Sequence, residues 1–404
     1  MLQDTAWMVI LQGLNYLVPL FVWPYLMVVL GAEGFGKIGF SLQLLQFMML
    51  MVDFGFNLSA TKQIATAPNQ EAIDRIATDT LWAKIVLFFL CTMITIGLLL
   101  LPRYAPYRWV AVVMFPMLIG NVFSFQWLFQ GLGKIRPMSM VTCVCRLLLL
   151  PLTFWMVKTA DDVLLAAAIL ASTYVLSGLI LTGWAIGGRL FRMVGTNMAR
   201  IREALKSSLP LFISTATSSI YAVLFVVILG YFASPYEVGC YSAVEKIMRV
   251  GCYLMLLPAI QVFYPKISKL YSEDRAAAQK MVRWVLVTIM GMMVVWGLVL
   301  FMGGSTIVRL LGKDYTGTET LFHIMAFIPL MIAMSGICGQ LGLVAMGESK
   351  QYSQFRNVYL TGAIVALVMV GALSVILNAQ WAAICLLCAE TIVGLGMYIC
   401  YKRI

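Results

Sequence analysis

The sequence predicts an all-α polytopic membrane protein with about twelve transmembrane helices, arranged as two six-helix halves. The first observation is composition: 62% of the 404 residues are hydrophobic and only 11% are charged. A water-soluble fold could not bury so much apolar surface. The second is the length of the apolar runs, which at about 20 residues each match one crossing of a bilayer. The third is that the runs are continuously apolar instead of alternating, which favours helices over the strands of a barrel.

Taken in order, the apolar runs cover nearly the whole chain, and short polar connections separate them. The start, Met1-Leu2-Gln3-Asp4, lacks the basic segment of a signal peptide, so we expect the first span to be retained. Pro19 and Pro24 predict a bend in that span, which could serve motion or fixed packing. The expected spans are 5–30, 35–56, 80–102, 109–130, 138–157, 162–186, 207–232, 239–265, 281–303, 318–346, 355–377 and 379–400.

Basic residues predict the orientation. With these spans, about 19 lysines and arginines lie on the side of both termini and about 6 on the other side, a strong positive-inside bias. The larger group includes Lys84, at the start of the third span. We therefore expect both termini to be cytoplasmic.

The chain also resembles two halves in tandem, 1–188 and 207–404, joined by a basic linker at 189–206. In each half a span closes with Leu-Gly, at Leu30-Gly31 and again at Leu229-Gly230. Six spans per half give both halves the same orientation, which is a parallel repeat. The end of the linker, from residue 199, is either an amphipathic helix on the anionic inner leaflet or a plain topogenic charge cluster.

The eighth span carries a charged stripe that is the main functional candidate. Glu245, Lys246 and Arg249 fall within roughly a 100° arc of the helix. Charges at membrane depth cost several kcal/mol unless they face a bundle interior or a wet cavity. Glu245 and Arg249 are spaced to form an ion pair along the helix, which leaves Lys246 as a net positive charge.

Polar residues on the first two spans form a second group of candidates. Gln12 and Asn15 share a face of the first span, and Gln46 and Asp53 lie on one side of the second. Asp53 is close to the expected cytoplasmic end. It is either an interfacial acid paired with a basic neighbour, or a proton or cation site or a gate residue.

Three isolated polar residues need an explanation. Arg146 lies near the middle of the fifth span and Glu390 near the middle of the last, and each requires a partner at that depth. The structural explanation is a buried pair inside one half. The sequence does not indicate which charges meet. The single histidine, His323, is expected to be buried and neutral, because it has no companions for a metal site.

Several classes of function are excluded. The chain has no phosphate-binding glycine loop, no HExxH motif and no nucleophile elbow, so we expect no enzyme. The formal charge of +11 comes mainly from lysines and arginines outside the apolar runs and does not indicate a nucleic-acid partner. The nine cysteines lie almost entirely in apolar runs and are expected to be free buried thiols. No metal or other cofactor is expected.

Short motifs occur along essentially the whole chain. They are Asn15-Tyr16-Leu-Val-Pro19, Pro24-Tyr25-Leu26, Asp53-Phe-Gly-Phe-Asn-Leu-Ser-Ala-Thr61, Trp127-Leu-Phe-Gln-Gly131, Pro151-Leu-Thr-Phe154, Leu209-Pro-Leu-Phe-Ile-Ser-Thr215, Tyr241-Ser242-Ala243, Glu245-Lys246-Ile247 and Tyr264-Pro265-Lys266-Ile267-Ser268. In this order and spacing, they resemble the motifs of the Wzx-type flippases of O-antigen and capsule synthesis. These flippases belong to the multidrug/oligosaccharidyl-lipid/polysaccharide (MOP) exporter superfamily, which also contains the lipid II flippase MurJ.

The resemblance implies a transporter of the bacterial inner membrane whose two halves enclose a central cavity and expose it to each side in turn. Its cargo would be an undecaprenyl-pyrophosphate-linked oligosaccharide, moved from the cytoplasmic to the periplasmic leaflet. The pyrophosphate is an anion that lysine and arginine attract strongly where the dielectric constant is low. The candidate protein partners are an O-antigen polymerase and a chain-length regulator.

On this hypothesis the charged stripe holds the pyrophosphate through Lys246 and Arg249, with a contribution from Arg146. The amides of Gln12, Asn15 and Gln46 would meet the sugars. Coupling to a proton or sodium gradient would use carboxylates. The candidates for that role are Asp53, Glu245 and Glu390.

Two alternatives are open. A drug or metabolite exporter like the MATE transporters would place carboxylates in its site instead of Lys246 and Arg249. A membrane glycosyltransferase or polymerase would carry a large periplasmic loop with catalytic residues, and no expected connection is long enough for one.

Overall fold

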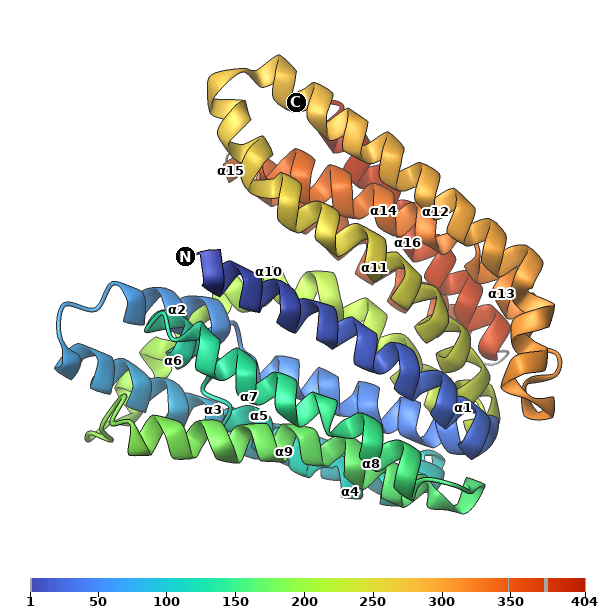
Figure 1. Ribbon diagram of the computed structural model, residues 1–404, viewed down its shortest axis with the longest axis horizontal. Helices are drawn as coiled ribbons and strands as arrows, with labels where there is room; N and C mark the ends of the chain where they lie inside the picture. Colours follow the sequence, from blue (N-terminus) through green and yellow to red (C-terminus); the bar gives the residue numbers. More distant parts are fainter. Residues whose placement is uncertain (1, 348, 374–376, 404) are drawn as a thin grey trace. The chain divides into compact units, whose positions relative to one another are not determined.

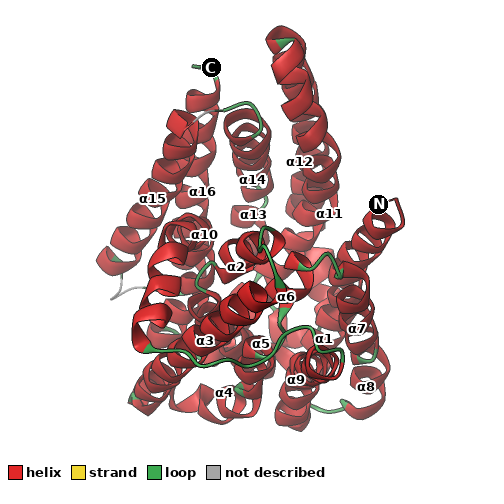
Figure 2. Cartoon of the chain, turned by 90° about the vertical axis from the view of Figure 1, so that its left-hand side faces the viewer, coloured by secondary structure: helices red, strands yellow, loops and turns green. Residues whose placement is uncertain are grey.

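The structure is a computed structural model that describes residues 2–347, 349–373 and 377–403. Side chains are described for 18–213, 216, 225–347, 350–373 and 377–403. Within these ranges the chain consists of helices and connecting loops, and no strand occurs (Figure 2). The predicted all-α fold class is therefore confirmed.

Two compact units can be distinguished in the chain. The first contains Met1–Leu30 and Lys37–Ala216, and the second contains Gly31–Gly36 and Thr217–Ile404. The division into 1–188, 189–206 and 207–404 was inferred from sequence symmetry and stays a prediction.

The helices up to residue 216 belong to the first unit, except for the short segment 31–36 of α1. The last of them, α10, continues into the second unit. Their bounds are α1 Leu2–Asp53, α2 Phe56–Ala65, α3 Gln70–Leu100, α4 Arg108–Met114, α5 Pro116–Val122, α6 Gln126–Gly131, α7 Ile135–Leu147, α8 Leu149–Met156, α9 Val163–Gly187 and α10 Met198–Phe232, with 3-10 turns at Pro102–Tyr107 and Ala160–Asp162.

Helix α9 is the centre of packing in the later part of the first unit: it contacts α4, α5, α7 and α8 (Figure 1). Two glycines bring α5 and α9 together. A Cβ atom at Gly120 would meet the backbone carbonyl of Tyr174, and one at Gly178 would meet the backbone of Gly120. Small residues permit this close approach of two membrane helices. The contact between α5 and α9 holds the neighbouring polar residues in position.

The second unit is built from five long or broken helices. Figure 1 shows α11 beside α12 and α14 beside α16, in agreement with their contacts. The bounds are α11 Pro235–Glu273, α12 Arg275–Leu311, α13 Glu319–Met325, α14 Ile328–Gly336, a π-helix at Ile337–Val344, α15 Ser349–Ala372 and α16 Ala379–Tyr401, with a 3-10 turn at Lys313–Tyr315.

The glycine-bearing turn of the first repeat packs inside the second unit. A Cβ atom at Gly36 would meet the backbone of Pro235 and Gly239, and one at Gly239 would meet the carbonyl of Ala32. Only residues without a side chain permit this backbone contact. Gly36 and Gly239 therefore face each other.

The structure gives more detail on the number of spans, on the first helix and on the end of the basic linker. Among the described residues, 9 helices are long and apolar enough to cross a membrane, or 10 if the bent pair Pro102–Met114 and Pro116–Gly131 forms one span. The exact count of twelve stays a prediction. Helix α1 continues through Pro19 and Pro24, where the predicted bend stays a prediction, and its backbone leaves the helical conformation at Gly31, where φ is 67°. Residues 199–206 form the first turns of α10 and are not a separate surface helix.

Candidate functional site

Helix α11 carries the predicted charged stripe. The helix begins where Ser234 accepts a hydrogen bond from the backbone N–H of Glu237 at 3.3 Å, with Pro235 in its first turn. Such an N-cap and a first-turn proline stabilise a helix start. Further along, Trp296 of α12 packs against Gly251 and donates its indole N–H to the carbonyl of Met248 at 3.2 Å. This contact fixes the charged turn of α11 against α12.

The predicted ion pair on α11 is present and has a second acid beside it. Arg249 donates from Nε to Glu245 Oε1 at 2.9 Å, and its Nη2 lies 4.0 Å from Glu390 Oε1 on α16. The side chains are 16%, 5% and 3% exposed, respectively. Glu390 therefore has its cation inside the second unit, as the structural explanation required. The Nη2 group makes no hydrogen bond among the described residues.

Lys246 follows Glu245 directly and lies half-buried on the same helix. The two cations and two carboxylates of this set, Glu245, Lys246, Arg249 and Glu390, sum to a formal charge of zero. The net positive charge that the sequence predicted for α11 alone is therefore balanced by Glu390. An anion that approaches Lys246 and Arg249 competes with carboxylates that are already in place.

A second ion network lies in the first unit, at Asp53. Lys84 of α3 donates from Nζ to Asp53 Oδ1 at 3.0 Å and to the carbonyl of Asn121 at 3.1 Å. The amide of Asn121 donates to the same Asp53 oxygen at 3.0 Å. Lys84 is 1% exposed, whereas Asp53 is 24% exposed. Asp53 thus has the basic partner that one interpretation required, and the other interpretation, a proton or cation site, stays untested.

Lys84 is a buried charged residue that the sequence analysis did not single out. The positive-inside count placed it with the loop cations, but the structure buries its ammonium group among α1, α3 and α5. Its position inside the predicted span 80–102 was the available signal. A lysine at such a position requires a carboxylate, and Asp53 supplies it.

Arg146 has different surroundings. It lines a cavity of about 160 Å³ in the first unit, together with polar residues of α5, α6, α7 and α9. The lining includes Asn121, Ser124, Gln126 and Thr142, and no aspartate or glutamate among the described residues. Within the described part of the chain, Arg146 forms neither an ion pair nor a hydrogen bond. No described residue therefore supplies the buried pair that the structural explanation requires for Arg146, and that explanation stays a prediction.

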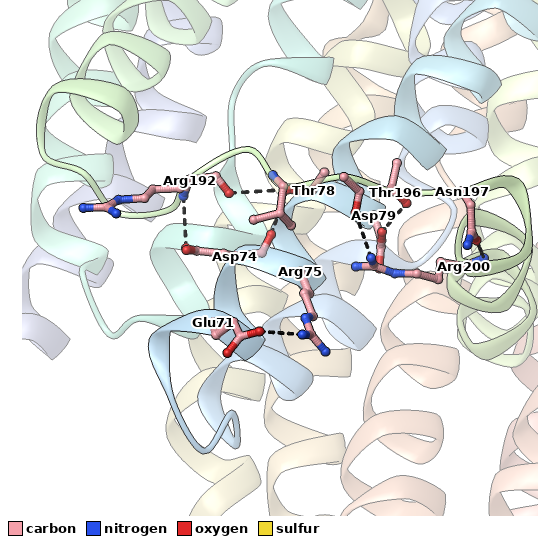
Figure 3. Close-up of polar contacts among 11 residues, drawn as sticks. Glu71, Asp74, Arg75, Thr78, Asp79, Arg192, Thr196, Asn197 and Arg200 are labelled. Carbon is pink, nitrogen blue, oxygen red and sulfur yellow. Dashed lines mark hydrogen bonds and ion pairs between the residues drawn. The ribbon is translucent and has the colours of Figure 1, made fainter.

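The basic linker is held against the start of α3, as Figure 3 shows. The backbone N–H of Arg192 donates to Asp74 at 3.0 Å, and that of Val194 donates to Thr78 at 3.2 Å. Further along, Arg200 forms an ion pair with Asp79 at 2.8 Å. We call residues 189–200 the strap. Its bonds explain why this polar segment has a defined path.

The remaining predictions have mixed outcomes. Gln12 and Asn15 lie outside the residues whose side chains are described, and Gln46 is half-buried on α1. His323 is exposed, with its ring 4.6 Å from that of Phe301, so the prediction of a buried histidine is wrong. The short helix α13 turns its ring outward from the core. All nine cysteines are free, as predicted, and seven are buried.

Comparison with known proteins identifies related chains. The sequence profile of the family described as polysaccharide biosynthesis protein matches residues 1–271. A protein of Escherichia coli strain K12 named "Putative O-antigen transporter" is 29% identical over 394 residues, which are 97% of this chain and 94% of the relative. A similarly named protein of Shigella dysenteriae is 28% identical and covers 96% of each chain. These relatives confirm the prediction of a transporter rather than an enzyme.

A solved structure of the lipid II flippase MurJ, in an inward closed conformation, matches with a TM-score of 0.78 at 12% identity. The match covers 100% of this chain and 88% of that one. At such low identity this match shows the fold alone. It confirms the predicted fold of an all-α polytopic membrane protein.

Proposed function

Because the chain belongs to the polysaccharide biosynthesis protein family, we propose that it moves a lipid-linked oligosaccharide across the bacterial inner membrane. The cargo is an undecaprenyl-pyrophosphate-linked repeat unit, which passes from the cytoplasmic to the periplasmic leaflet by alternating access. The observation that carries the proposal is the match, over nearly the full length of the chain, to a relative named for O-antigen transport. The intramembrane cations of α11 add a physical reason, since a pyrophosphate needs positive charge at that depth.

On this proposal Lys246 meets the pyrophosphate first. Arg249 already donates to Glu245, and its Nη2 group is buried and makes no hydrogen bond among the described residues, so it becomes a donor to the cargo only once the site opens. As the anion arrives, it competes with Glu245 and Glu390 for the guanidinium. Glu245 and Glu390 are therefore the proposed groups of this unit that couple cargo binding to a proton or sodium gradient. Asp53 is the corresponding candidate in the first unit, and Gln12, Asn15 and Gln46 remain the proposed sugar contacts.

The test uses two lysines of the same helix. Lys246→Ala is expected to abolish surface display of the glycan and to leave lipid-linked intermediate in the cytoplasmic leaflet, whereas Lys246→Arg retains most of the display. Lys269→Ala is the matched control, because the Lys269 side chain is 80% exposed on α11. Each variant is expressed in a strain whose own transporter gene has been deleted, and surface glycan is measured at equal protein levels. Normal display by Lys246→Ala would contradict the assigned role of Lys246.

A second arm of the experiment addresses the exporter alternative. Cells that express the protein are loaded with a cationic dye, and efflux is followed by fluorescence. We expect no efflux above that of cells without the protein. Efflux without any restoration of surface glycan would replace the proposed function by drug export.

A further inference from the structure

The backbone is broken beside the cavity that contains Arg146. The span Pro102–Met114 and Pro116–Gly131 bends by 44°, and a second interruption separates α5 from α6. There Phe125 has a φ of 47°, although it is not a glycine and is only 2% exposed. A left-handed bulky residue is strained, and such strain is concentrated at functional sites. Within a membrane, irregular backbone is tolerated where it is buried in protein or lines a polar cavity.

The interruption turns polar groups toward the cavity. Asn121 at the end of α5, Ser124 in the break and Gln126 at the start of α6 all line it, and Thr142 lies one turn before Arg146 on α7. Broken helices of this kind commonly form the ligand sites of transporters. The close contact of α5 and α9 at Gly120 holds this wall in position.

The charge balance of the cavity is positive. Arg146 is the only charged residue among those described as lining it. The hydroxyl groups of Ser124 and Thr142 donate to backbone carbonyls, each at 2.9 Å, so they offer dipoles but no negative charge. These hydroxyls can rotate toward an anion, and a guanidinium has five N–H donors for it. Because a membrane-depth arginine requires compensation, the cavity favours an anionic ligand.

The size of the cavity suits a small ligand. Its volume of about 160 Å³ is far more than one water molecule needs, and it admits a group as large as a single phosphate. We propose that the Arg146 cavity is a binding site for one phosphate-sized anion, separate from the charged stripe of α11. The anion is either a free inorganic ion or the phosphate of a lipid headgroup.

Asn121 connects this site to the Asp53 network. Its backbone carbonyl accepts from Lys84 and its amide donates to Asp53, while the residue also lines the cavity. An anion that rearranges Asn121 would therefore act directly on the Asp53–Lys84 ion pair. Anion binding at this site would therefore change the surroundings of the Asp53 carboxylate.

The test measures anion-dependent thermal stability of the purified full-length protein in a neutral detergent. Sodium phosphate is titrated against sodium gluconate at constant ionic strength, since gluconate is a larger anion with a single, more diffuse charge. Phosphate should raise the unfolding midpoint of the wild type in a saturable way, because a ligand stabilises the state that binds it. In Arg146→Gln the apparent affinity should fall by about tenfold or more, the loss expected for a charged hydrogen bond. Arg146→Lys should recover part of the response.

Control variants show whether the phosphate response comes from Arg146 or from other cationic residues. Arg103→Gln removes an exposed arginine at the start of the same broken span and should respond like the wild type. Lys269→Gln, at an exposed position of α11, should also respond like the wild type. This experiment measures phosphate binding at Arg146 and not glycan display, so the anion site can fail while the proposed function holds. Thr142→Val, which retains Arg146, should weaken the response and serves if Arg146→Gln does not fold.

An experiment in lipid nanodiscs distinguishes the two possible sources of the anion. In nanodiscs, phosphatidylglycerol should stabilise the wild type over Arg146→Gln, relative to phosphatidylcholine, if the ligand is a lipid phosphate. A response to free phosphate in detergent without this lipid effect assigns the site to a soluble anion. Equal responses of the wild type and Arg146→Gln in both arms, or no response in either, would overturn the proposal.

Discussion

Arg249 and Arg146, two of the arginines that lie on membrane-spanning helices, are held in opposite ways. Arg249 has two carboxylates beside it, Glu245 at 2.9 Å and Glu390 at 4.0 Å. Arg146 has neutral amides and hydroxyls around it and no carboxylate among the described residues that line its cavity. The first arginine belongs to a charge-balanced set within the protein. The second arginine needs a negative charge that the described side chains around it do not supply. Residue type alone therefore indicates that an arginine in a membrane needs a partner, but not which group provides it.

The largest effect in this comparison should come from Arg249→Met. The change leaves Glu245 and Glu390 buried without their cation, and breaking a buried pair in this way costs about 3–5 kcal/mol. We expect a large fall in the thermal unfolding midpoint and loss of glycan display. Adding Glu390→Gln should recover part of the stability, since it removes one of the two stranded charges. A single variant as stable as the wild type would show that Arg249 is not the cation of this set.

The Asp53–Lys84 pair should give the next largest effect. Asp53→Asn keeps the shape but leaves Lys84, at 1% exposure, without its carboxylate, at a cost of about 3 kcal/mol. The double variant Asp53→Asn with Lys84→Met removes both charges and should be nearly as stable as the wild type. If Asp53 also couples transport to an ion gradient, the stable double variant will remain inactive in glycan display. Recovery of transport together with stability would assign Asp53 a structural role only.

The strap contains a partly exposed ion pair, whose contribution to stability can be compared with that of the buried ion pairs. Arg200 and Asp79 are 31% and 15% exposed. Solvent screens such a pair, so Arg200→Ala should lower the free energy of unfolding by about 1 kcal/mol or less. The measurement is the denaturation midpoint in the same detergent. A cost as large as that of Arg249→Met would mean that the strap contributes much more than one ion pair.

The smallest effect is expected for Arg146→Met, when phosphate is absent. No carboxylate loses a partner, so the free energy of unfolding should change by less than about 0.5 kcal/mol or become more favourable. The comparison of Arg146→Met with Arg249→Met at equal expression sharpens the contrast between the two arginines. A loss of several kcal/mol at Arg146 would show that a protein group compensates it.

Local spacing was enough to predict some of these features. The apolar runs identified the membrane spans, and the separation of Glu245 and Arg249 by one helical turn predicted their ion pair, because such neighbours meet on any α-helix. The family resemblance rested on short motifs spread along the whole chain. Those motifs do not require knowledge of which helices touch.

Partners on different helices could not be predicted in the same way. Glu390 reaches Arg249 because α16 packs on α11, and Lys84 reaches Asp53 because α3 lies against the end of α1. Neither contact has a signal in spacing along the chain. The Arg146 cavity depends on the break at Phe125, whose strained conformation is a tertiary effect that opposes the local preference of phenylalanine.

The strap has a consequence for biosynthesis. The backbone N–H of Arg192 donates to Asp74, which lies 118 positions earlier in the chain. The side chain of Arg200 donates to Asp79, which lies 121 positions earlier. The acids of α3 therefore leave the ribosome long before their partners and must remain solvated until residue 200 has been made. A nascent chain stopped at residue 188, after the predicted first half, would contain α3 but none of these partners. We expect such a fragment to be a target for membrane proteases, and the segment up to residue 200 to be the shortest that closes the start of α3.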